Sequence, residues 1–505
     1  MDMPNTSIKL DDKFNIKKSN VLLNGTQGLV RLMLGQKQRD EKQGLNTAGF
    51  VTGYRGSPLG AVDFQMRRAS KELLASKIKF KEALNEDLAT TALWGAQQAE
   101  LRGEGLYDGV FGLWYGKGPG VDRSGDAMRH ANMAGSSVHG GVLMAMGDDH
   151  SGESSTVLHQ SDLAMIDAGM PILSPAGVQE ILDYGYYGFA LSRYSGLWVG
   201  LKTMKDTIEV TSVVDGDPFR MEFKKPKKIT GADNLNIRLV DTPADQEKRL
   251  LSDKKIAAED FARVNRIDKI VLPKRDAKIG LVAAGKNWLD LIHALSLLGI
   301  DEKEAAALGI TSYKIVQTWP IDRKSLNEWA DQLDLIIVIE EKRKIVETQI
   351  KDALFSIGSK TRVYGGHKND EKLFLDHGVL DPLDIASTLG QIFKEEGCSN
   401  KTLELSLKKI TEVQSVDNAP DLAERLPYFC AGCPHNSSTI VPEGSRAYAG
   451  IGCHYMAQWM DRETLGFTHM GGEGANWIGE SLFSKRQHVF QNIGDGTYNH
   501  SGIQA

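Results

Sequence analysis

Short apolar segments alternate with helical stretches and glycine-rich loops between residues 21 and 214. Four of these segments have the length and composition of buried strands: 48–54, 109–115, 141–147 and 197–201. Strands separated by helices are typical of a parallel sheet. The pattern therefore predicts an α/β domain at residues 26–216, preceded by a polar and loosely ordered extension at residues 1–25.

A second α/β pattern occupies residues 276–394, about the size that one hydrophobic core needs. The segment 279–285 predicts a buried strand that ends in glycine, and a helix after it as far as Gly299. The apolar positions that define this helix are Leu289, Ile292, Leu295 and Leu298. A further strand is predicted at 313–318, another at the strongly apolar run 335–339, and helices at 324–333 and 344–355.

Two polar segments, 217–275 and 395–424, are predicted to be linkers, the first of them with a helix. A third unit then begins at residue 425. A length of 505 residues agrees with about three domains. The organisation is therefore an extension, two α/β domains and a third unit that we expect to be incomplete at residue 505.

The composition excludes several classes of protein. A net charge of −6 argues against a nucleic-acid partner, for which a basic face is expected. No run approaches the roughly 20 apolar residues of a membrane span, and the N-terminal segment has no apolar core. Four cysteines are too few for a disulfide framework, so we expect a cytoplasmic protein in a reducing compartment.

An apolar run at 489–493 leads directly into Gly494-Asp495-Gly496. A strand followed by such a loop delivers a carboxylate, and glycines let backbone N–H groups approach phosphate oxygens. Mg²⁺ can then bridge the carboxylate and a diphosphate. Gly-Asp-Gly is also ordinary turn chemistry, so both interpretations stay open. Such a site needs more oxygen ligands downstream, so we expect the chain to be cut inside its own cofactor site.

Three cysteines lie in the third unit: Cys430 and Cys433 form a C-x-x-C pair, and Cys453 lies in a glycine loop. A C-x-x-C pair lets two thiolates bind one metal or cluster from a single turn. Three interpretations remain open. The cysteines are structural, or they bind zinc together with His435 or His454, or they hold a 4Fe-4S cluster whose fourth ligand lies beyond residue 505.

Two further motifs lie in the first domain. In the loop 53–60, Ser57 is predicted to cap a helix, and Arg55 beside it could bind a carboxylate. Asn85-Glu86-Asp87 is predicted to start another helix, where simple capping explains either carboxylate. Asp148 and Asp149 are interpreted as loop hydrogen-bonding residues, with a metal site as the alternative.

Three histidines of the first domain, His139, His150 and His159, are interpreted as structural, because loop histidines are more often structural or solvated than catalytic. We therefore expect none of them in an active site.

Together, the motifs resemble those of the 2-oxoacid:ferredoxin oxidoreductases, above all the indolepyruvate type in its long form, which fuses two subunits. The segments that carry the resemblance are GYRGSPLG (53–60), NEDLATTALWGAQQ (85–98), GLWYGKGPGVDRSGDAMRHAN (112–132), MGDDHSGESS (146–155), CAGCPH (430–435) and GDG (494–496). The resemblance is strong over residues 26–215 and 426–505 and looser over 278–393.

The resemblance implies a multidomain α/β fold that depends on thiamine diphosphate. Residues 26–216 would form the pyrimidine-binding domain, residues 276–394 a transketolase C-terminal-like domain, and residues 425–505 a truncated diphosphate-binding domain. The resemblance further implies that the cofactor binds between the first and the third of these domains.

The resemblance also implies roles for single residues. Glu86 matches the catalytic glutamate, with Asp87 as its rival, and Ser57 matches a hydroxyl residue that holds the substrate carboxylate. Arg55 stands where many relatives have proline, so its role in substrate binding is our own inference. The residues expected to bind the cofactor are Gly452, His454, Gly471, Gly472, Gly494, Asp495 and Gly496, with Asp495 as the Mg²⁺ ligand. The residues expected to hold the 4Fe-4S cluster are Cys430, Cys433 and Cys453.

The implied reaction is the oxidative decarboxylation of an aryl 2-oxoacid, indolepyruvate, with coenzyme A as co-substrate and ferredoxin as electron acceptor. A homo-oligomer is expected, and the chain alone is expected to be inactive. Many relatives carry ferredoxin-like cysteine repeats, which this sequence lacks. The alternatives are an oxidoreductase for pyruvate, 2-oxoglutarate or branched-chain 2-oxoacids, a non-oxidative thiamine-dependent lyase, and a non-catalytic zinc-binding module.

Overall fold

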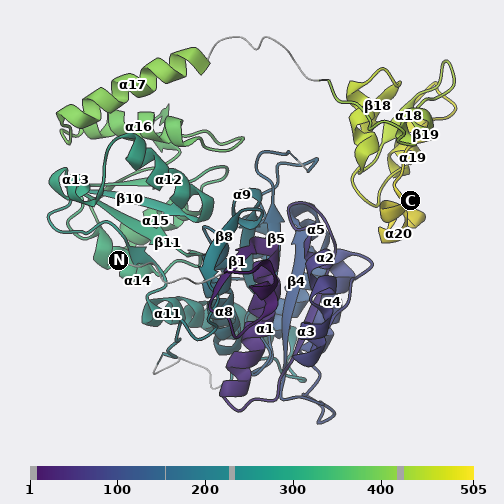
Figure 1. Cartoon of the computed structure of the whole chain (residues 1–505), viewed down its shortest axis with the longest axis horizontal. Coiled ribbons are helices and arrows are strands. Elements are labelled where there is room, and N and C mark those ends of the chain that lie inside the picture. Colours follow the sequence, from purple (N-terminus) through teal and green to yellow (C-terminus); the bar gives the residue numbers. More distant parts are fainter. Residues whose placement is uncertain (1–7, 154, 227–233, 418–425) are drawn as a thin grey trace. The chain divides into compact units, whose positions relative to one another are not determined.

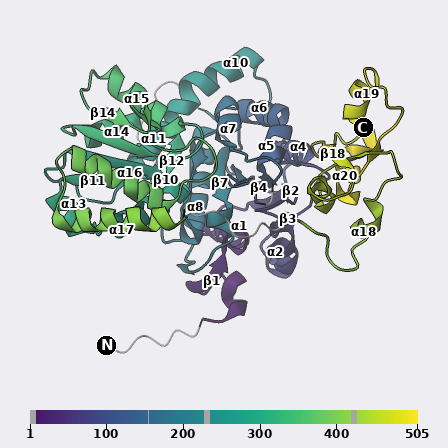
Figure 2. The same ribbon diagram turned by 90° about the horizontal axis from the view of Figure 1, so that it is seen from above.

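The computed structural model describes residues 8–153, 155–226, 234–417 and 426–505. The chain divides into two compact units, Met1–Ser415 and Val416–Ala505, and each is described by itself. Unit 1 contains two α/β sheets, and unit 2 contains one small sheet (Figures 1 and 2). Among the described helices, none has the length and apolar character to cross a membrane.

The first sheet of unit 1 has seven strands in the order β12-β6-β7-β5-β4-β2-β3. Their bounds are β2 Ala48–Gly53, β3 Ile78–Phe80, β4 Val110–Lys117, β5 Val142–Asp148, β6 Ile172–Leu173, β7 Val199–Met204 and β12 Gln317–Trp319. All pairs are parallel except β12 with β6. The four strands predicted in this region are therefore confirmed.

Helices cover both faces of this sheet. Successive strand residues point to opposite faces, and in the central strands both sets of side chains are apolar and need to be buried. On β5, Leu143 and Ala145 belong to the core under α1 and α8, whereas Met144 and Met146 belong to the core under α4 and α6. The helices are α1 Gly25–Lys42, α2 Val62–Arg68, α3 Ser70–Ala75, α4 Glu86–Ala96, α5 Gly118–Arg123, α6 Gly125–Ala134, α7 Asp162–Asp167, α8 Val178–Ser195 and α9 Lys205–Ile208.

The loose N-terminal extension expected at residues 1–25 is wrong for the described residues from 8 onward. A 3₁₀ turn, η1 (Leu10–Phe14), buries Phe14, and β1 (Asn20–Asn24) pairs antiparallel with β8 (Thr211–Asp215). The cause is Arg31 on α1, whose buried guanidinium donates to the carbonyl oxygens of Lys13 at 3.1 Å and Asn15 at 3.2 Å. A buried charge needs such partners, and they come from the N-terminal segment.

The second sheet of unit 1 has the order β14-β13-β10-β11-β9. Its strands are β9 Lys269–Ile270, β10 Ile279–Ala284, β11 Ile310–Ile315, β13 Leu335–Ile339 and β14 Arg362–Tyr364, and a hairpin of β15 His367–Lys368 and β16 Glu371–Lys372 follows. Its helices are α12 Gly285–Leu297, α13 Glu302–Ala307, α14 Arg323–Ala330, α15 Ile345–Ser356 and α16 Pro382–Glu395. The predicted strand at 335–339 and the predicted helices are confirmed.

Two details of this region differ from the prediction, and a third agrees with it. In α12, Leu289 and Ile292 are exposed, because Trp288 and Leu291 form the buried stripe one position earlier. The predicted polar linker from 395 is helical over α17 (Lys401–Asp417), which buries Leu403 against the second sheet, while residues 418–425 of that linker lie outside the described residues. The helix expected in the first linker exists, as α10 (Pro243–Lys248), a π turn η2 (Arg249–Lys254) and α11 (Lys255–Asn265).

The strand predicted at 313–318 is in fact two strands in two sheets. β11 ends at Ile315 in the second sheet, and β12 begins at Gln317 and pairs with β6 of the first sheet. The buried carboxylate of Asp268 accepts hydrogen bonds from the backbone N–H groups of Val316 at 2.7 Å and Gln317 at 3.2 Å. These two donors would otherwise lack partners at the crossing, so Asp268 stabilises the change of sheet.

Unit 2 holds a three-stranded parallel sheet in the order β18-β17-β19. The strands are β17 Ala447–Ala449, β18 Thr464–Phe467 and β19 Phe490–Gln491, and the helices are α18 His435–Ser438, η3 Cys453–Trp459, α19 Ala475–Ser481, α20 Asp495–His500 and η4 Gly502–Gln504. The apolar run before Gly494 is thus a strand, as predicted. The domain boundaries expected inside each unit stay a prediction.

Gln317 offers a test of the crossing between the two sheets. Its buried side chain accepts from the Tyr187 hydroxyl at 3.2 Å and donates to the Pro320 carbonyl oxygen at 2.7 Å. Gln317→Leu would leave both groups unpaired, so we expect the free energy of unfolding to fall by about 1–3 kcal/mol. Urea denaturation measures this, with the exposed Gln391→Leu as control. Equal stability of the two variants would contradict this account.

Candidate functional site

Glu86 lies at the start of α4, where Asn85 caps the helix by accepting from the N–H of Leu88 at 3.2 Å. The backbone carbonyl oxygen of Glu86 accepts a hydrogen bond from the indole N–H of Trp114 on β4 at 3.1 Å. Its carboxyl group lies against the first turn of α5, because a Cβ on Gly120 would stand 2.5 Å from Glu86 Oε1. Only glycine leaves room at position 120, and Glu86 is buried as a result, with 2% of its surface exposed.

The loop 53–60 follows β2, which lies between β3 and β4 in the sheet. No helix begins at Ser57, so the capping role predicted for it is wrong: the loop turns at 56–60 and α2 starts only at Val62. The turn forms because the buried side chain of Leu59 anchors it between two glycines, and its N–H bonds to the carbonyl oxygen of Gly56 at 2.8 Å.

Ser57 and Arg55 therefore lie at the same sheet edge as Glu86, but without a helix terminus to attract an anion. Ser57 is half-buried and lines a cavity of about 280 Å³ together with Asn24, Thr26 and Pro58. Arg55 is exposed. Both residues are at least partly exposed, and their roles in substrate binding stay a prediction.

In unit 2, the two glycine loops follow neighbouring parallel strands, β17 and β19, so they meet at one end of the sheet. A Cβ on Gly494 would lie 3.9 Å from His454 Cε1 and 3.9 Å from Thr497 Oγ1, which shows how closely the loops approach. His454 Nε2 and Thr497 Oγ1 are both buried and have no hydrogen-bond partner among the described residues. Buried polar atoms of this kind need a partner, and a phosphate-bearing group would supply it.

Burial, together with the neighbouring His435, lowers the pKa of His454 to about 4. The imidazole is therefore neutral near pH 7 and carries one N–H that it can donate. Asp495 is exposed at the start of α20, and Gly496 follows it in the same turn. Gly452 and Gly494 thus lie close to the His454 ring, with Asp495 and Gly496 next in the chain, and the binding of a cofactor by these residues stays a prediction.

Glu473 connects the loop that contains Gly471 and Gly472 to the loop that follows β17. This buried carboxylate accepts from the N–H of Gly471 at 2.6 Å and from the N–H of Ile451 at 3.4 Å. Gly471 is so close to the end of α20 that a Cβ there would stand 1.8 Å from Ser501 Oγ, and Gly472 lies next to the ring of His469. Glu473 and Thr497 were not predicted from the sequence, although they directly follow Gly472 and Gly496, which were.

The three cysteines are accessible but separate. Cys430 and Cys453 are exposed, whereas Cys433 is half-buried with its Sγ 3.1 Å from Nδ1 of His435. The His435 ring stacks on that of His454, with ring centroids 5.8 Å apart, so the cysteine turn lies beside the glycine loops. Within the described ranges, no group of three or more His, Cys, Asp or Glu side chains is placed to hold a metal ion. The thiols suit a cluster chemically, and the cluster itself stays a prediction.

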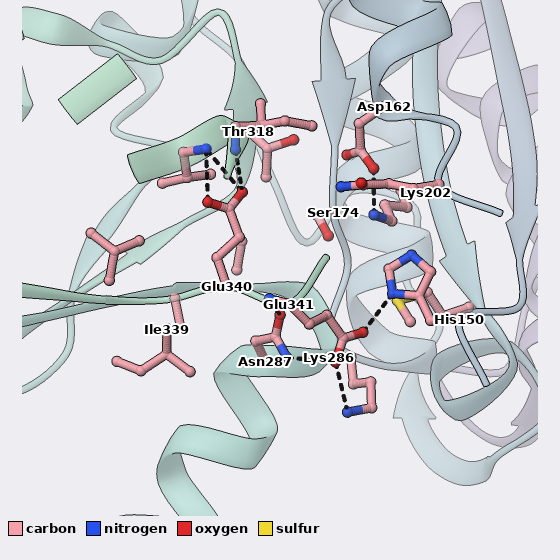
Figure 3. Close-up of a pocket in the computed structure, with 17 residues that line it drawn as sticks. His150, Asp162, Ser174, Lys202, Lys286, Asn287, Thr318, Ile339, Glu340 and Glu341 are labelled. Carbon is pink, nitrogen blue, oxygen red and sulfur yellow. Dashed lines mark hydrogen bonds and ion pairs between the residues drawn. The ribbon is translucent and has the colours of Figure 1, made fainter. Parts of the chain in front are cut away.

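A different polar site lies in unit 1, around a cavity of about 40 Å³ where the two sheets meet (Figure 3). Glu341, which follows β13, accepts from His150 Nδ1 at 2.6 Å, from Asn287 at 3.2 Å and from the N–H of Leu380 at 3.0 Å. Burial alone would raise the pKa of Glu341, but the His150 contact and the charge of Lys286 hold it well below its usual range.

The preceding residue, Glu340, contacts the start of a helix instead of His150. Its carboxylate caps α15 by accepting from the N–H groups of Ile345 at 3.0 Å and Val346 at 2.9 Å, and burial raises its pKa to about 7. On the far side of the cavity, Lys202 donates to Asp162 at 2.5 Å. The cavity is large enough for one or two water molecules, so its charged walls are paired with each other rather than arranged around a ligand.

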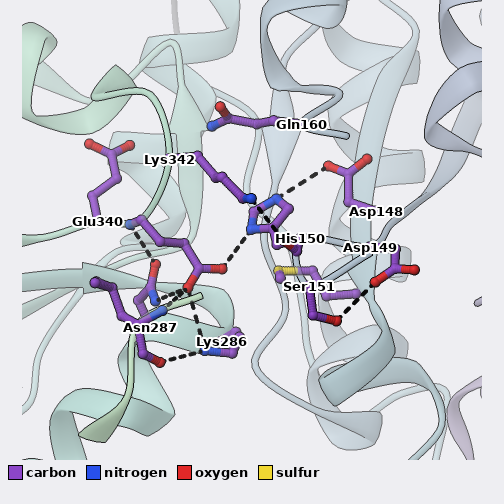
Figure 4. Close-up of polar contacts among 12 residues, drawn as sticks. Asp148, Asp149, His150, Ser151, Gln160, Lys286, Asn287, Glu340 and Lys342 are labelled. Atoms are coloured by element: carbon purple, nitrogen blue, oxygen red, sulfur yellow. Dashed lines mark hydrogen bonds and ion pairs between the residues drawn. The ribbon is translucent and has the colours of Figure 1, made fainter. Parts of the chain in front are cut away.

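Figure 4 shows Asp148, Asp149 and His150 within this network. Asp148 accepts from the N–H of Ser161 at 2.9 Å, and Asp149 accepts from the hydroxyl of Ser151 at 3.1 Å. The prediction that the two aspartates serve loop hydrogen bonding is confirmed. His150 is structural as expected, yet its partner Glu341 lies 191 positions away, which no local pattern indicates.

Comparison with known proteins gives matches along nearly the whole chain. A family model for an indolepyruvate oxidoreductase domain matches residues 269–417. Indolepyruvate oxidoreductase subunit IorA of Pyrococcus abyssi is 25% identical over 524 residues, which cover 99% of this chain and 73% of the relative. The subunit of the same name from Methanothermobacter marburgensis is 24% identical and covers 90% of this chain and 69% of its own. The expected resemblance to the indolepyruvate oxidoreductases is confirmed, whereas the fused form stays a prediction.

A solved structure also matches. It is the 2-oxoglutarate:ferredoxin oxidoreductase from Magnetococcus marinus with 2-oxoglutarate, coenzyme A and succinyl-CoA bound. The match has a TM-score of 0.53 and 14% sequence identity, and it covers 74% of this chain and 66% of that chain. This likeness confirms the α/β fold class that was expected for the chain.

The ion pairs of His159 in the polar network of unit 1 should make the stability of the protein depend on pH. Burial lowers its pKa, but contacts with Asp122 at 2.7 Å and Asp148 at 3.5 Å outweigh burial and raise it to about 9. A raised pKa adds stability that is complete below about pH 6.5 and is lost as the pH rises to about 9. We therefore expect the melting temperature to fall less over this range in His159→Gln than in the wild type.

Thermal unfolding measured between pH 6 and pH 9.5 tests this expectation. His130→Gln is a suitable control, because His130 also contacts an aspartate but is exposed on α6. It should keep the wild-type dependence on pH. If His159→Gln kept it too, the ion pairs of His159 would not be the cause.

Proposed function

We propose that this chain, which resembles the indolepyruvate oxidoreductases along nearly its whole length, takes part in the oxidative decarboxylation of a 2-oxoacid. The proposed substrate is an aryl 2-oxoacid, indolepyruvate, and the products are an acyl-CoA and CO₂, with ferredoxin as electron acceptor. The observation that supports this best is the convergence of the glycine loops of unit 2 on the unpaired atoms of His454 and Thr497. We further propose a cytoplasmic homo-oligomer.

Thiamine diphosphate, when bound, would supply a nucleophilic carbon and an electron sink for the loss of CO₂. Glu86 would hold a proton at a ring nitrogen of the aminopyrimidine, because its carboxyl group is buried and fixed at a helix start. Gly452, Gly494 and Gly496 would offer backbone N–H groups to the diphosphate. Asp495 would bind the accompanying Mg²⁺.

The side chains of unit 2 add to this site. His454 is neutral and would donate a hydrogen bond, and Thr497 would donate another from its hydroxyl group. Gly471 and Gly472 would line the same loop end, held in place through Glu473. The pairing of these groups with phosphate oxygens would relieve the cost of burying them alone.

The remaining predicted residues would serve the substrate and the electrons. Ser57 and Arg55 would bind the 2-oxoacid from the loop after β2, where both are accessible. Cys430, Cys433 and Cys453 would hold a 4Fe-4S cluster, whose single-electron chemistry suits transfer to ferredoxin. The short path from Cys433 through His435 to His454 supports an arrangement in which cluster and cofactor are neighbours.

The proposed function is tested on the complete enzyme, purified without oxygen, by reduction of methyl viologen. Indolepyruvate, coenzyme A, thiamine diphosphate and Mg²⁺ are omitted in turn. Reduction that needs all four would support the proposal. Release of CO₂ without reduction of viologen would instead indicate a non-oxidative lyase, and tight zinc without any turnover would indicate a binding module.

Glu86→Gln keeps the shape of the side chain but removes the group that holds a proton. We expect kcat to fall at least about 100-fold, since general acid–base catalysis contributes this much. The matched control is Asp87→Asn, the next carboxylate in the same helical turn, which is partly exposed and 3.9 Å from Arg123. Loss of activity in Asp87→Asn alone would assign the role to Asp87 instead.

Cys433→Ser tests the cluster. We expect the iron content and the rate of viologen reduction to fall together, because a serine hydroxyl is a poor ligand for iron in such a cluster. Cys398→Ser is the control, since Cys398 lies in unit 1 against the core of the second sheet. Unchanged iron in Cys433→Ser would exclude Cys433 as a ligand.

A further inference from the structure

Lys117 is the last residue of β4 and lies directly before α5. Its aliphatic chain covers the loop 53–60, because a Cβ on Gly56 would stand 2.8 Å from Lys117 Cδ and 3.1 Å from its Cγ. The lysine side chain thus occupies the space that the missing side chain of Gly56 leaves. This contact places Lys117 against the loop that carries Arg55 and Ser57.

The same lysine lies near Glu86. The turn that follows it, Gly118–Gly120, presses on the Glu86 carboxyl group, as the 2.5 Å approach at Gly120 shows. Burial lowers the pKa of Lys117, and the negative charge of Glu86 partly offsets this by raising it. Lys117 therefore stands between the two groups of residues that the sequence assigned to catalysis and to substrate binding.

Unlike Lys202 and Lys286, Lys117 has no hydrogen-bond or ion-pair partner among the described residues. Lys202 is paired with Asp162 at 2.5 Å, and Lys286 with Asp290 at 2.7 Å. By contrast, the ammonium group of Lys117 takes part in no hydrogen bond or ion pair with any residue that the structure describes. A half-buried cation without a partner is costly, so the position has a use that outweighs this cost.

We propose that Lys117 binds the carboxylate of the 2-oxoacid substrate in the corner between the loop 53–60 and Glu86. This inference rests on the proposed function and names the cation that the substrate needs. Arg55 is exposed, and the helix start expected at Ser57 does not exist, so neither provides a buried positive charge. Lys117 does, and its three donors can pair with both oxygens of a carboxylate.

The chemistry of the reaction is consistent with a binding role. The carboxylate leaves as neutral CO₂, so a cation that holds it stabilises bound substrate more than the transition state. Removal of Lys117 should therefore raise KM for the 2-oxoacid much more than it lowers kcat. Since burial lowers the pKa of Lys117, wild-type KM should also rise toward alkaline pH as the ammonium group loses its proton.

The test compares Lys117→Met and Lys117→Arg with the wild type in the complete enzyme. Viologen reduction gives kcat and KM, and inhibition by phenylacetate and by its uncharged amide reports on binding of the carboxylate alone. In Lys117→Met we expect KM and the inhibition constant for phenylacetate to rise at least about tenfold, with the amide unaffected. Lys117→Arg should restore most of the affinity, and the alkaline rise in KM should disappear in Lys117→Met.

Lys79→Met is the matched control, because Lys79 is an exposed lysine on β3 of the same sheet. It should leave every constant unchanged. KM and phenylacetate inhibition within twofold of wild type in Lys117→Met would overturn this inference and leave the proposed function intact. Absence of any 2-oxoacid turnover in the wild-type enzyme would overturn both.

Discussion

The buried contact between His150 and Glu341 joins the ends of the two sheets on which unit 1 is built. Each residue follows an inner strand of its sheet, and both are almost fully buried, so water cannot solvate either polar side chain. Lys286 and the N–H of Leu380 complete the partners of Glu341. Loss of one member would leave a buried polar side chain without its partner, so this group of contacts helps to hold the two sheets together.

This network reaches the candidate site through a short series of contacts. His159 lies against Gly118, where a Cβ would stand 2.3 Å from its Nδ1, and Gly118 follows Lys117 in the chain. The same turn receives Glu86 at Gly120. The turn that contacts Glu86 is therefore packed on its other side against His159 and the charged network, and Gly118 and Gly120 leave room for these two side chains. A rigid support of this kind is what a site needs when its reacting groups must hold their positions.

Much of this could be predicted from the sequence, because strands, caps and glycine loops depend on residues close together in the chain. Four strands of the first sheet and the helix start at residues 85–87 are examples. The remainder depends on distant partners. Nothing near Arg31 shows that its guanidinium will collect carbonyl oxygens from residues 13–18, and nothing near His150 shows Glu341. The continuously buried segment 313–318 likewise conceals a change of sheet, since burial is equal on both sides of Val316.

That change of sheet also sets the order in which the chain can be completed. Among the described residues, the outer edge of β6 at Ile172–Leu173 is covered by Gln317–Trp319, which lies beyond several helices and three strands of the other sheet. At roughly 5–20 residues per second, a ribosome would need about 7–30 s to add the intervening segment. During that interval an edge strand of the first sheet is open to pairing with other chains. The first sheet is thus completed only when β12 has been synthesised. A chain that stopped near residue 275 would keep the edge of β6 exposed.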